Sequence, residues 1–393
     1  MQTILIGGGI GGLTAALWLH KVGVPCRIFE ASPAFRPLGV GISLQPHAMT
    51  ELAEVGLAPA LMSRGVVAKE KAFFTASGSL IHSEPYDTAQ LADPYVTIQR
   101  SDLHDILLGE VIRRLGPDAV VMDRRCVRVE QSGDFVTVHF VDSNGSAKAE
   151  RADIAVGCDG LHSAVRRQMY PNESAPIYSG VTSWRGLVRS SPFLSGSSIA
   201  LVGAFDTALF MAYPVRQHAD GGQLLNLIAS VPKPVPIEID GSGTPGRRED
   251  FIEHFREWTF DWLDVPGLLY GTDSYLELPL VDRDPLARWT FDRVTLLGDA
   301  AHPMSPRGGN GAAQSIIDAA ELARSLANEP DIRSALERYE AKRRPAANTV
   351  VMANRESPPD LIIKRAGDGP AVDSAEFKNI WANYNRLTGA ARD

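Results

Sequence analysis

The chain has few cysteines and no long apolar run, and each lack excludes a class of protein. Its three cysteines, Cys26, Cys126 and Cys158, are far apart. This spacing excludes a CxxC redox pair or a zinc cluster and is typical of a reducing compartment. No stretch approaches the roughly 20 apolar residues that span a bilayer. The N-terminus, MQTILIGGG, has no basic region or cleavage site, which predicts an unprocessed, cytoplasmic protein.

Basic charge is also scarce. The 39 Lys and Arg residues are scattered and are outnumbered by 47 Asp and Glu, for a net charge of −8. Nucleic-acid binding is therefore not expected. The 393 residues are 44% hydrophobic, which predicts a globular protein of two domains. We expect a small-molecule substrate, no membrane partner, no metal, and a monomer or homodimer.

The first 32 residues carry a nucleotide-binding pattern. The run TILIGGGIGGLTAALWLHKVGVPCRIFEAS is typical of strand, tight turn, helix and strand. Gly7, Gly9 and Gly12 match GxGxxG, in which the glycines permit the turn, the approach of a pyrophosphate and close packing of the helix. Glu30 ends the second strand, where a carboxylate accepts hydrogen bonds from a ribose diol. The alternative is a Gly-rich turn between two buried strands, and the motif does not separate NAD from FAD.

Two later segments repeat the pattern of a strand that ends in Gly and Asp before a helix. In ADIAVGCDGLHSAVRRQM the turn holds Asp159 and Gly160, and an ordinary Asp-Gly turn with a solvated basic helix is the simpler interpretation of this segment alone. In RVTLLGDAAHPMSPRGGNGAAQ, Asp299 ends a buried strand, and a helix is expected from about Gly311. The positive end of that helix would face a ligand.

The rest of the chain alternates between α/β and β-rich pieces. We expect a β-meander with a turn at Asn144-Gly145, a helix N-capped by Ser101, a surface excursion at 233–250 and a long helix at 332–354 that includes Pro345. The predicted division is a discontinuous nucleotide domain (1–71, 95–180 and 283–355), a β-sheet substrate domain (72–94 and 181–282) and a C-terminal helical tail (356–393).

The three motifs together resemble a known family. GGGIGG with Glu30, CDGLHSAVRR and GDAAHPMSPRGGNGAAQ are similar, in order and spacing, to the single-component FAD-dependent aromatic hydroxylases of the para-hydroxybenzoate and salicylate hydroxylase type. The resemblance spans residues 1 to about 355. Within the family, FRPLGVGISLQP, WRG, AYPV, LVDRDPL and LERYEAKRRPAAN are most similar to phenazine-carboxylate monooxygenases. It implies an α/β fold in which a Rossmann-like FAD-binding domain is interleaved with a β-sheet substrate domain.

The resemblance also implies a cofactor site. Glu30 would bind the adenosine ribose, Val127 would contact adenine through its backbone, and Asp299 would bind the ribityl or pyrophosphate part. Asp159 would support the cavity that handles nicotinamide. The implied FAD contacts are Gly7, Gly9, Ile10, Gly11, Gly12, Glu30, Arg36, Arg100, Val127, Asp159, Asp299, Pro306, Gly308, Gly309, Asn310 and Gly311. For Arg36 and Arg100, an ordinary surface arginine is the alternative.

The implied reaction uses NADH or NADPH, FAD and O2. A C4a-hydroperoxyflavin would hydroxylate an electron-rich ring, and a carboxylated carbon would lose CO2 if attacked. No second GxGxxG follows a strand, so a separate nicotinamide domain is not expected. Two alternatives stay open: a reductase or oxidase that acts by hydride transfer on the same fold, and a flavin-carrying sensor.

Candidate substrate contacts come from the β-rich pieces and the Gly-rich loops. They are Ser43, Gln45, Trp184, Arg185, Met211 and Tyr213, and the residues nearest the chemistry would be Arg185, Tyr213 and Pro303. A packed sheet face is the alternative for Trp184 and Met211. Some salicylate-type relatives carry a histidine base just before Tyr-Pro, whereas this chain has ALFMAYPV. We therefore expect a ring that is already activated, such as an N-heteroaromatic acid, and structural roles for His47 and His302.

Overall fold

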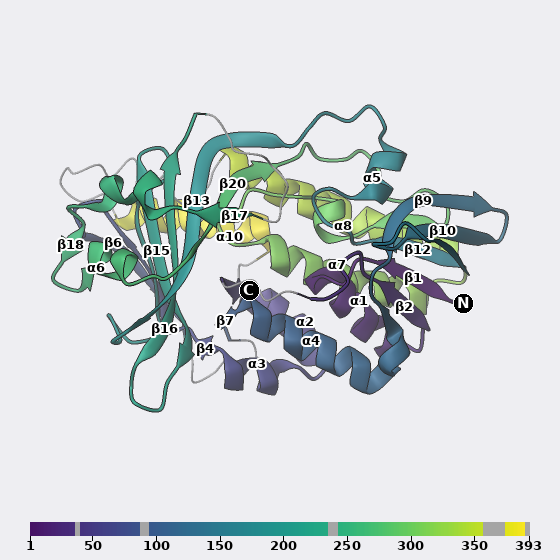
Figure 1. Ribbon diagram of the computed structural model, residues 1–393, viewed down its shortest axis with the longest axis horizontal. Helices are drawn as coiled ribbons and strands as arrows, with labels where there is room; N and C mark the ends of the chain where they lie inside the picture. Colours follow the sequence, from purple (N-terminus) through teal and green to yellow (C-terminus); the bar gives the residue numbers. More distant parts are fainter. Residues whose placement is uncertain (36–39, 87–93, 235–242, 357–373, 390–393) are drawn as a thin grey trace.

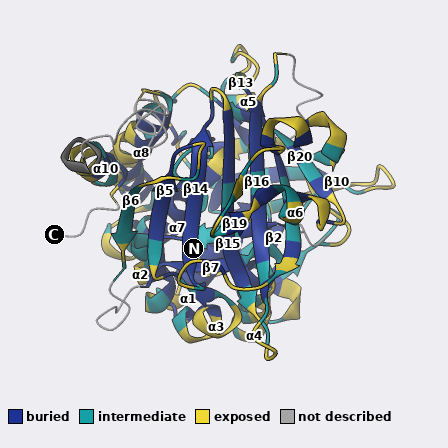
Figure 2. Cartoon of the chain, turned by 90° about the vertical axis from the view of Figure 1, so that its left-hand side faces the viewer, coloured by how far each residue is buried: buried dark blue, intermediate teal, exposed yellow. Residues whose placement is uncertain are grey.

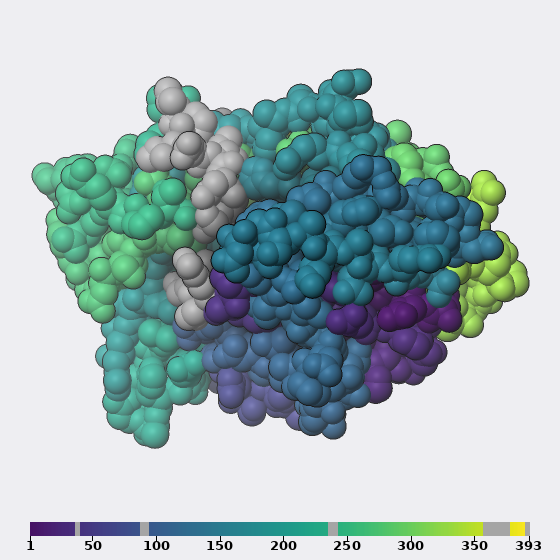
Figure 3. Space-filling model, turned by 45° about the vertical axis from the view of Figure 1, so that its right-hand side comes forward, coloured from purple at the N-terminus to yellow at the C-terminus, as the bar shows by residue number. Residues whose placement is uncertain are grey.

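The computed structural model describes residues 1–35, 40–86, 94–234, 243–356 and 374–389. These residues form two lobes side by side, one built on a parallel sheet and one on a large, mostly antiparallel sheet (Figure 1). In the space-filling view the residues around 200–280, in green, lie beside those around 100–150, in blue (Figure 3). Arg36, one of the predicted cofactor contacts, lies outside the described residues.

The first lobe contains a five-stranded parallel sheet with the order β21-β12-β1-β2-β8. Its strands are β1 (Thr3–Ile6), β2 (Cys26–Phe29), β8 (Val120–Val121), β12 (Ile154–Gly157) and β21 (Val294–Leu296). The helices of this lobe include α1 (Ile10–Lys21), α4 (Arg100–Leu115), α5 (Ala164–Met169), α7 (Gly311–Asn328) and α8 (Ile332–Glu356), with short turns η1 (Pro117–Ala119) and η4 (Gly298–Ala300). Strand β1 is buried along its whole length, as expected of a parallel strand covered on both faces.

A three-stranded meander packs on the parallel sheet. It consists of β9 (Arg125–Ser132), β10 (Phe135–Val141) and β11 (Ala147–Ala152). The rings of Phe29 in β2 and Phe140 in β10 stack with centroids 4.6 Å apart. The polypeptide that follows β1, β2, β12 and β21 leaves the sheet at its carboxyl edge, where doubly wound sheets bind ligands.

The second lobe is an eight-stranded sheet with the order β17-β20-β13-β16-β15-β14-β5-β6. Its strands are β5 (Glu70–Phe74), β6 (Leu80–Pro85), β13 (Ile177–Ser190), β14 (Ser198–Ala204), β15 (Ala208–Gln217), β16 (Gln223–Pro232), β17 (Thr244–Gly246) and β20 (Tyr275–Asp282). Its outer face is covered by η2 (Arg248–Asp250), η3 (Ile252–Phe255), α6 (Val265–Tyr270) and the hairpin of β18 (Thr259–Phe260) and β19 (Leu263–Asp264). Figure 2 looks at this face, and the central strands are buried.

The lobes are joined by a small sheet and buried hydrogen bonds. The sheet consists of β3 (Gly41–Leu44), β7 (Val96–Gln99) and β4 (Val66–Val67). Helix α2 (Pro46–Glu54) follows β3 in the chain, and α3 (Ala58–Arg64) precedes β4. The Asn226 side chain in β16 accepts a 2.5 Å bond from the Gly41 N–H. The Thr97 hydroxyl donates to the carbonyl of Pro214 at 2.6 Å. These bonds fix the large sheet over the carboxyl edge of the parallel sheet.

Several predicted elements are confirmed and two are corrected. The meander turn is present, with Gly145 at φ +80°, and α8 includes Pro345. Ser101 is not an N-cap: α4 begins at Arg100 after Gln99, which makes no side-chain cap bond. The 233–250 segment is not only a surface excursion, because β17 adds an edge strand to the large sheet. Within it, residues 235–242 lie outside the described part of the chain.

The C-terminal tail ends in a packed helix, α10 (Ser374–Thr388). Trp381 and Tyr384 of α10 are buried, 7% and 2% exposed. They pack with Phe73 of β5, whose ring lies 5.2 Å from that of Trp381. The helix therefore covers one end of the inner face of the large sheet. The predicted domain boundaries stay a prediction.

Candidate active site

Two cavities follow the carboxyl edge of the parallel sheet. The nucleotide cavity, of about 530 Å³, is lined by the ends of β1, β2 and β12 and by β9. The ring cavity, of about 360 Å³, lies between that edge and the inner face of the large sheet. Gly9, Cys158 and Gly160 line both cavities. Together the cavities form an elongated site that passes the N-terminus of α1.

The first glycine motif has the geometry that a pyrophosphate requires. Gly7 has φ +112°, and a Cβ on it would lie 2.4 Å from the carbonyl oxygen of Cys158. A Cβ on Gly12 would lie 2.1 Å from the carbonyl oxygen of Gly7, whereas one on Gly9 would meet nothing within 4 Å. Gly9 is the N-cap of α1 and makes no side-chain cap bond. The first N–H groups of α1 are thus available to an anion in the cavity.

Three further predicted contacts line the nucleotide cavity: Glu30, Val127 and Asp159. The Glu30 carboxylate accepts 2.8 Å bonds from the N–H groups of Gly8 and Ser32. These bonds orient the carboxylate, which keeps lone pairs for a ribose diol. Val127 is 51% exposed on β9.

One carboxylate oxygen of Asp159 accepts a hydrogen bond from the start of α5, and the other has no partner among the described residues. Its Oδ2 accepts a 2.7 Å bond from the N–H of Ala164. Its Oδ1 is buried and has no hydrogen-bond partner among the described residues, and burial raises the pKa of its carboxyl. A buried polar atom without a partner is expected to bind a ligand or water. The open cradle at Gly9 and this oxygen both fit a dinucleotide such as FAD.

The loop from Pro306 to Gly311, here called the glycine loop, forms one wall of the ring cavity. Pro306, Gly308, Gly309 and Gly311 line the cavity, as do Asp299, Arg100, Ile10 and Gly11. Gly308 and Gly309 have φ of +83° and +73°, values that L side chains rarely adopt. Helix α7 begins at Gly311 with no side-chain cap bond. Its N-terminus therefore presents N–H groups to negative charge in this cavity.

Buried ion pairs hold the polypeptide that leads into the glycine loop. Asp318 in α7 accepts bonds from His302 Nε2 at 2.5 Å, from Arg343 Nε at 2.7 Å and from the N–H of Gly298 at 3.0 Å. Burial alone would raise the pKa of Asp318, but His302 and Arg343 lower it to about 2. His302 is 1% exposed, which agrees with the structural role expected for it.

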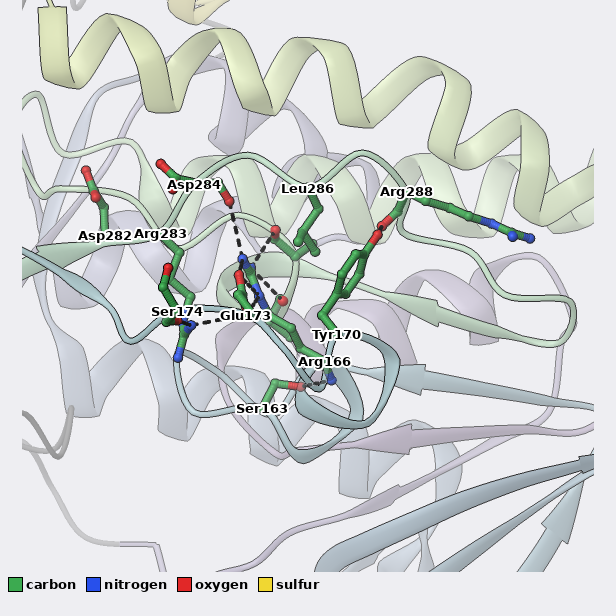
Figure 4. A network of polar contacts seen from close by, with 12 residues as sticks. Ser163, Arg166, Tyr170, Glu173, Ser174, Asp282, Arg283, Asp284, Leu286 and Arg288 are labelled. Carbon is green, nitrogen blue, oxygen red and sulfur yellow. Dashed lines mark hydrogen bonds and ion pairs between the residues drawn. The ribbon is translucent and has the colours of Figure 1, made fainter.

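Helix α5 is not solvated in the way the isolated motif suggested. Arg166 is 1% exposed and forms an ion pair with Glu173 (Figure 4). Its guanidinium also donates to the carbonyls of Ala300 at 3.2 Å and Ala301 at 3.0 Å. The second motif thereby fixes the strand-end turn of the third. The error arose because a basic residue on a short helix gives no sign of distant carbonyl partners.

The large sheet supplies the opposite wall of the ring cavity. Arg185 in β13 is paired in register with Ile228 in β16, and Ile228 with Met211 in β15. Arg185, Met211 and Tyr213 line the cavity, together with Ser43 of β3. Residues directly paired across strands share a face, so a guanidinium lies at one end of an apolar floor.

The groups in the ring cavity favour binding of an anion over removal of a proton. Arg185 Nε is buried without a hydrogen-bond partner among the described residues, and burial lowers the pKa of Arg185. Burial also raises the pKa of Tyr213 and Cys158, so both stay neutral at pH 7. Asp299 is the one carboxylate among the described residues that line the cavity, and no histidine is among them.

Four predicted contacts do not lie as expected. Trp184 is fully buried on the outer face of β13, where its ring stacks on Phe251 at 4.9 Å. Pro303 is buried and does not line the ring cavity. Gln45 donates to the carbonyls of Gly308 at 3.0 Å and Gly309 at 3.3 Å, so it supports the glycine loop.

Asn310 is the fourth, since its side chain faces away from the cavity. Its Nδ2 donates to the Tyr384 hydroxyl at 2.7 Å, and that hydroxyl donates to Asn354 Oδ1 at 2.6 Å. The tail helix α10 is thus bonded to the glycine loop. The amphipathic pattern of the tail indicated a helix, but no local signal placed Tyr384 against a loop about 75 residues earlier.

Sequence reasoning also missed Lys71 and Tyr95, which line the ring cavity. Both are buried, at 5% and 6% exposure. The run EKAFF held a usable signal, because residues two apart in a strand share a face, so Lys71 lies on the same face as the apolar Phe73.

Comparisons with known proteins agree with this geometry. A family model described as an FAD binding domain matches residues 1–222 and 281–354. Phenazine 1,6-dicarboxylic acid hydroxylase PhzS of Lysobacter antibioticus is 39% identical over 363 residues, 90% of this chain and 89% of that protein. The 3-amino-4-hydroxybenzoate 2-monooxygenase PtnB3 of Streptomyces platensis is 35% identical over 90% of this chain and 86% of that protein.

A solved structure shows the same architecture. A variant of HpxO from Klebsiella pneumoniae, complexed with FAD, superposes with a TM-score of 0.76 at 25% identity, over 99% of this chain and 94% of that one. The chain is thus similar along nearly its full length to a protein that holds FAD. None of the helices in the described residues has the length and hydropathy that crossing a membrane requires.

Proposed function

The chain belongs to the family of FAD-binding proteins that includes the aromatic monooxygenases, and we propose that it hydroxylates a carboxylated N-heteroaromatic compound of the phenazine type. It is an FAD-dependent aromatic monooxygenase with NAD(P)H as electron donor. The substrate class is our proposal. The observation that carries it is Arg185, which lines one end of an apolar cavity floor and whose Nε is buried without a hydrogen-bond partner among the described residues.

Charge complementarity supports a carboxylate at Arg185. Ion pairs with arginine are strong when water is excluded and the geometry is planar. Met211 and Ile228 beside Arg185 offer an apolar surface to a ring. A fused aromatic acid would place its carboxylate at Arg185 and its ring on these side chains, and the similarity to a phenazine dicarboxylate hydroxylase points the same way.

FAD, when bound, supplies the transfer of electrons from NAD(P)H to O2 and of one oxygen atom to the ring. For this chain we propose that the N–H groups at the start of α1 bind the pyrophosphate and that Glu30 binds the adenosine ribose. The N–H groups at Gly311 stabilise negative charge on the ring system of the cofactor. The glycine loop and the large sheet exclude water from the ring cavity.

The lack of a histidine among the described cavity residues bears on the substrate. A phenol that must lose a proton needs a nearby base. The neutral Tyr213 and Cys158 do not serve at pH 7, because burial raises the pKa of both. An amino-substituted or nitrogen-containing ring is electron-rich without deprotonation, so it is the class we propose.

The test is an anaerobic screen of aromatic acids with the FAD-loaded enzyme. Flavin reduction by NADH and by NADPH is followed by absorbance with phenazine-1-carboxylate, a pyridine carboxylate and salicylate. We expect the phenazine acid to stimulate reduction most, and aerobic turnover to consume O2 and yield a hydroxylated product. Fast hydroxylation of salicylate with no response to N-heteroaromatic acids would contradict the proposal.

The same assay separates the alternatives. Stimulated oxidation of NAD(P)H without hydroxylated product would favour a reductase or oxidase. No ligand-dependent turnover at all would favour a flavin-carrying sensor. A cytoplasmic location, a monomeric or homodimeric state and loss of CO2 during the reaction stay predictions.

A further inference from the structure

Lys71 is a buried cation that no described carboxylate neutralises. Its side chain extends from β5 and is 5% exposed. Among the described residues its Nζ has no hydrogen-bond or ion-pair partner, and its contacts are the ring faces of Trp381 at 4.7 Å and Phe73 at 5.6 Å. Burial lowers the pKa of Lys71 to about 8, which still leaves it mainly charged at pH 7. A buried charge in such surroundings is costly unless a ligand pairs with it.

The position of Lys71 joins two cavities. It lines the ring cavity and also an outer cavity of about 440 Å³, which α10, β6 and α2 enclose. Tyr95 and Gly308 also line both. The two spaces therefore meet at Lys71, and a ligand that fills the ring cavity can extend to its ammonium group.

The register of the sheet places Lys71 and Arg185 at opposite ends of one floor. Arg185, Ile228, Met211, Leu201 and Phe73 form a continuous row of paired residues across β13, β16, β15, β14 and β5. Lys71 is two residues before Phe73, so it lies on the same face. Four strand spacings of about 4.8 Å place the strands of Arg185 and Lys71 about 19 Å apart across the sheet.

The charge in the cavity is unbalanced. Lys71, Arg100 and Arg185 line it and face one described carboxylate, Asp299. Burial lowers the pKa of Arg100, and the nearby charge of Asp299 partly offsets this effect. Arg185 and Lys71 are left without an acidic partner among the described residues, although the protein as a whole carries a net charge of −8.

We propose that Lys71 forms a second anion subsite, so that the preferred substrate is a fused aromatic compound with an acidic group at each end, one bound by Arg185 and the other by Lys71. The apolar side chains between the two cations contact the ring system. The ring faces of Trp381 and Phe73 flank the ammonium group, and low-polarity surroundings strengthen its pairing with a carboxylate. This inference rests on the proposed function and specifies its substrate.

The test compares two acids on the same ring. Phenazine-1-carboxylate and phenazine-1,6-dicarboxylate are titrated into the FAD-loaded enzyme, and Kd is read from the flavin absorbance change. We expect the wild type to bind the dicarboxylate at least 10-fold more tightly. In Lys71→Met that ratio should fall to near 1, and in Lys71→Arg the preference should persist. Lys69→Met, which removes an exposed lysine two residues earlier, is the matched control and should keep the wild-type ratio.

Two other outcomes would contradict the second subsite or the proposed function, and they can be told apart. An unchanged ratio in Lys71→Met, or equal weakening of both acids, overturns the second subsite while Arg185 and the proposed function stand. Binding of neither acid by the wild type, with no stimulation of flavin reduction, overturns the proposed function itself. The thermal unfolding of each variant is measured in parallel, so that a folding defect is not mistaken for lost binding.

Discussion

The two walls of the ring cavity differ in whether their enclosed charged side chains have partners of opposite charge. Behind the glycine loop, Asp318 is fully buried and is paired with both His302 and Arg343. On the large sheet, Lys71 is buried and Arg185 is half-buried with its Nε enclosed, and neither has an acidic partner among the described residues. The first wall is complete without a ligand, whereas the second is electrostatically complete only when anions are bound.

This difference separates residues that build the site from residues that bind the substrate. A paired buried charge lowers its own desolvation cost and fixes neighbouring backbone, here the turn at Gly298. An unpaired one destabilises the empty protein and gains its partner only on binding. Substitutions should therefore have opposite effects on stability at the two walls.

The largest effect is expected behind the glycine loop. Asp318→Asn leaves Arg343 and His302 without their anion, and breaking a buried ion pair costs about 3–5 kcal/mol. We expect the free energy of unfolding in urea to fall by about that amount and FAD to dissociate more readily. Glu321→Gln on the same helix removes a half-exposed pair with Lys342 and should cost at most about 1 kcal/mol. Equal losses in the two variants would contradict the comparison.

At the large sheet the sign should reverse. A pKa lowered from 10.5 to about 8 by burial corresponds to a free-energy penalty on the folded state of roughly 3 kcal/mol. Below pH 8 both the folded and the unfolded state carry the charge, so the full destabilisation of the folded state applies. As the pH rises toward 10.5, this destabilisation disappears. Lys71→Met should therefore raise Tm at pH 7 and raise it less at pH 9.5. A lower Tm at pH 7 would show that Lys71 stabilises the empty fold.

Arg185 should affect binding more than folding. Arg185→Gln removes a charged hydrogen-bond donor, for which about 2 kcal/mol is typical, so Kd for phenazine-1-carboxylate should rise about 30-fold. The same substitution should weaken the binding of phenazine-1-carboxamide, the uncharged analogue, much less. Arg189→Gln on the same strand removes an exposed pair with Asp220 and serves as control. If the acid and the amide weaken alike, Arg185 does not bind the carboxylate.

The smallest effect concerns the tail helix. Tyr384→Phe removes the hydroxyl between Asn310 and Asn354, which leaves two buried amide groups unsatisfied at a cost of about 1 kcal/mol. Because this bond supports the glycine loop, we expect FAD to bind about 5-fold more weakly in a fluorescence titration. Tyr270→Phe on the exposed surface of α6 should not change FAD binding. An unchanged Kd for FAD in Tyr384→Phe would mean that α10 does not support the loop.

Local signals in the sequence were enough to predict the nucleotide-binding edge. Gly7, Gly12 and Glu30 are determined by a turn, a close contact and a strand end, all within about 30 residues of one another. The floor of the ring cavity was harder, because it is assembled from strands far apart in the chain. Trp184 and Arg185 are neighbours in sequence, and only the face that β13 turns to each lobe decides which one meets the ligand.

The ion pairs behind the loop could not be predicted for the same reason. His302, Asp318 and Arg343 come from three separate elements, and pairing among them depends on how α7 and α8 pack. Lys71 was missed because it lies in a short strand outside the three motifs, and one lysine in such a strand is not distinguished from a surface lysine by its neighbours.

The alternation along β13 also limits how this enzyme can change. Trp184 belongs to the outer core and Arg185 to the ring cavity, so one inserted or deleted residue upstream would exchange their faces. Point substitutions at Arg185, Met211 and Lys71 leave that alternation intact. A variant library aimed at new substrates should therefore randomise the inward-facing residues and keep strand lengths fixed, because a change in length would damage the core before it altered selectivity.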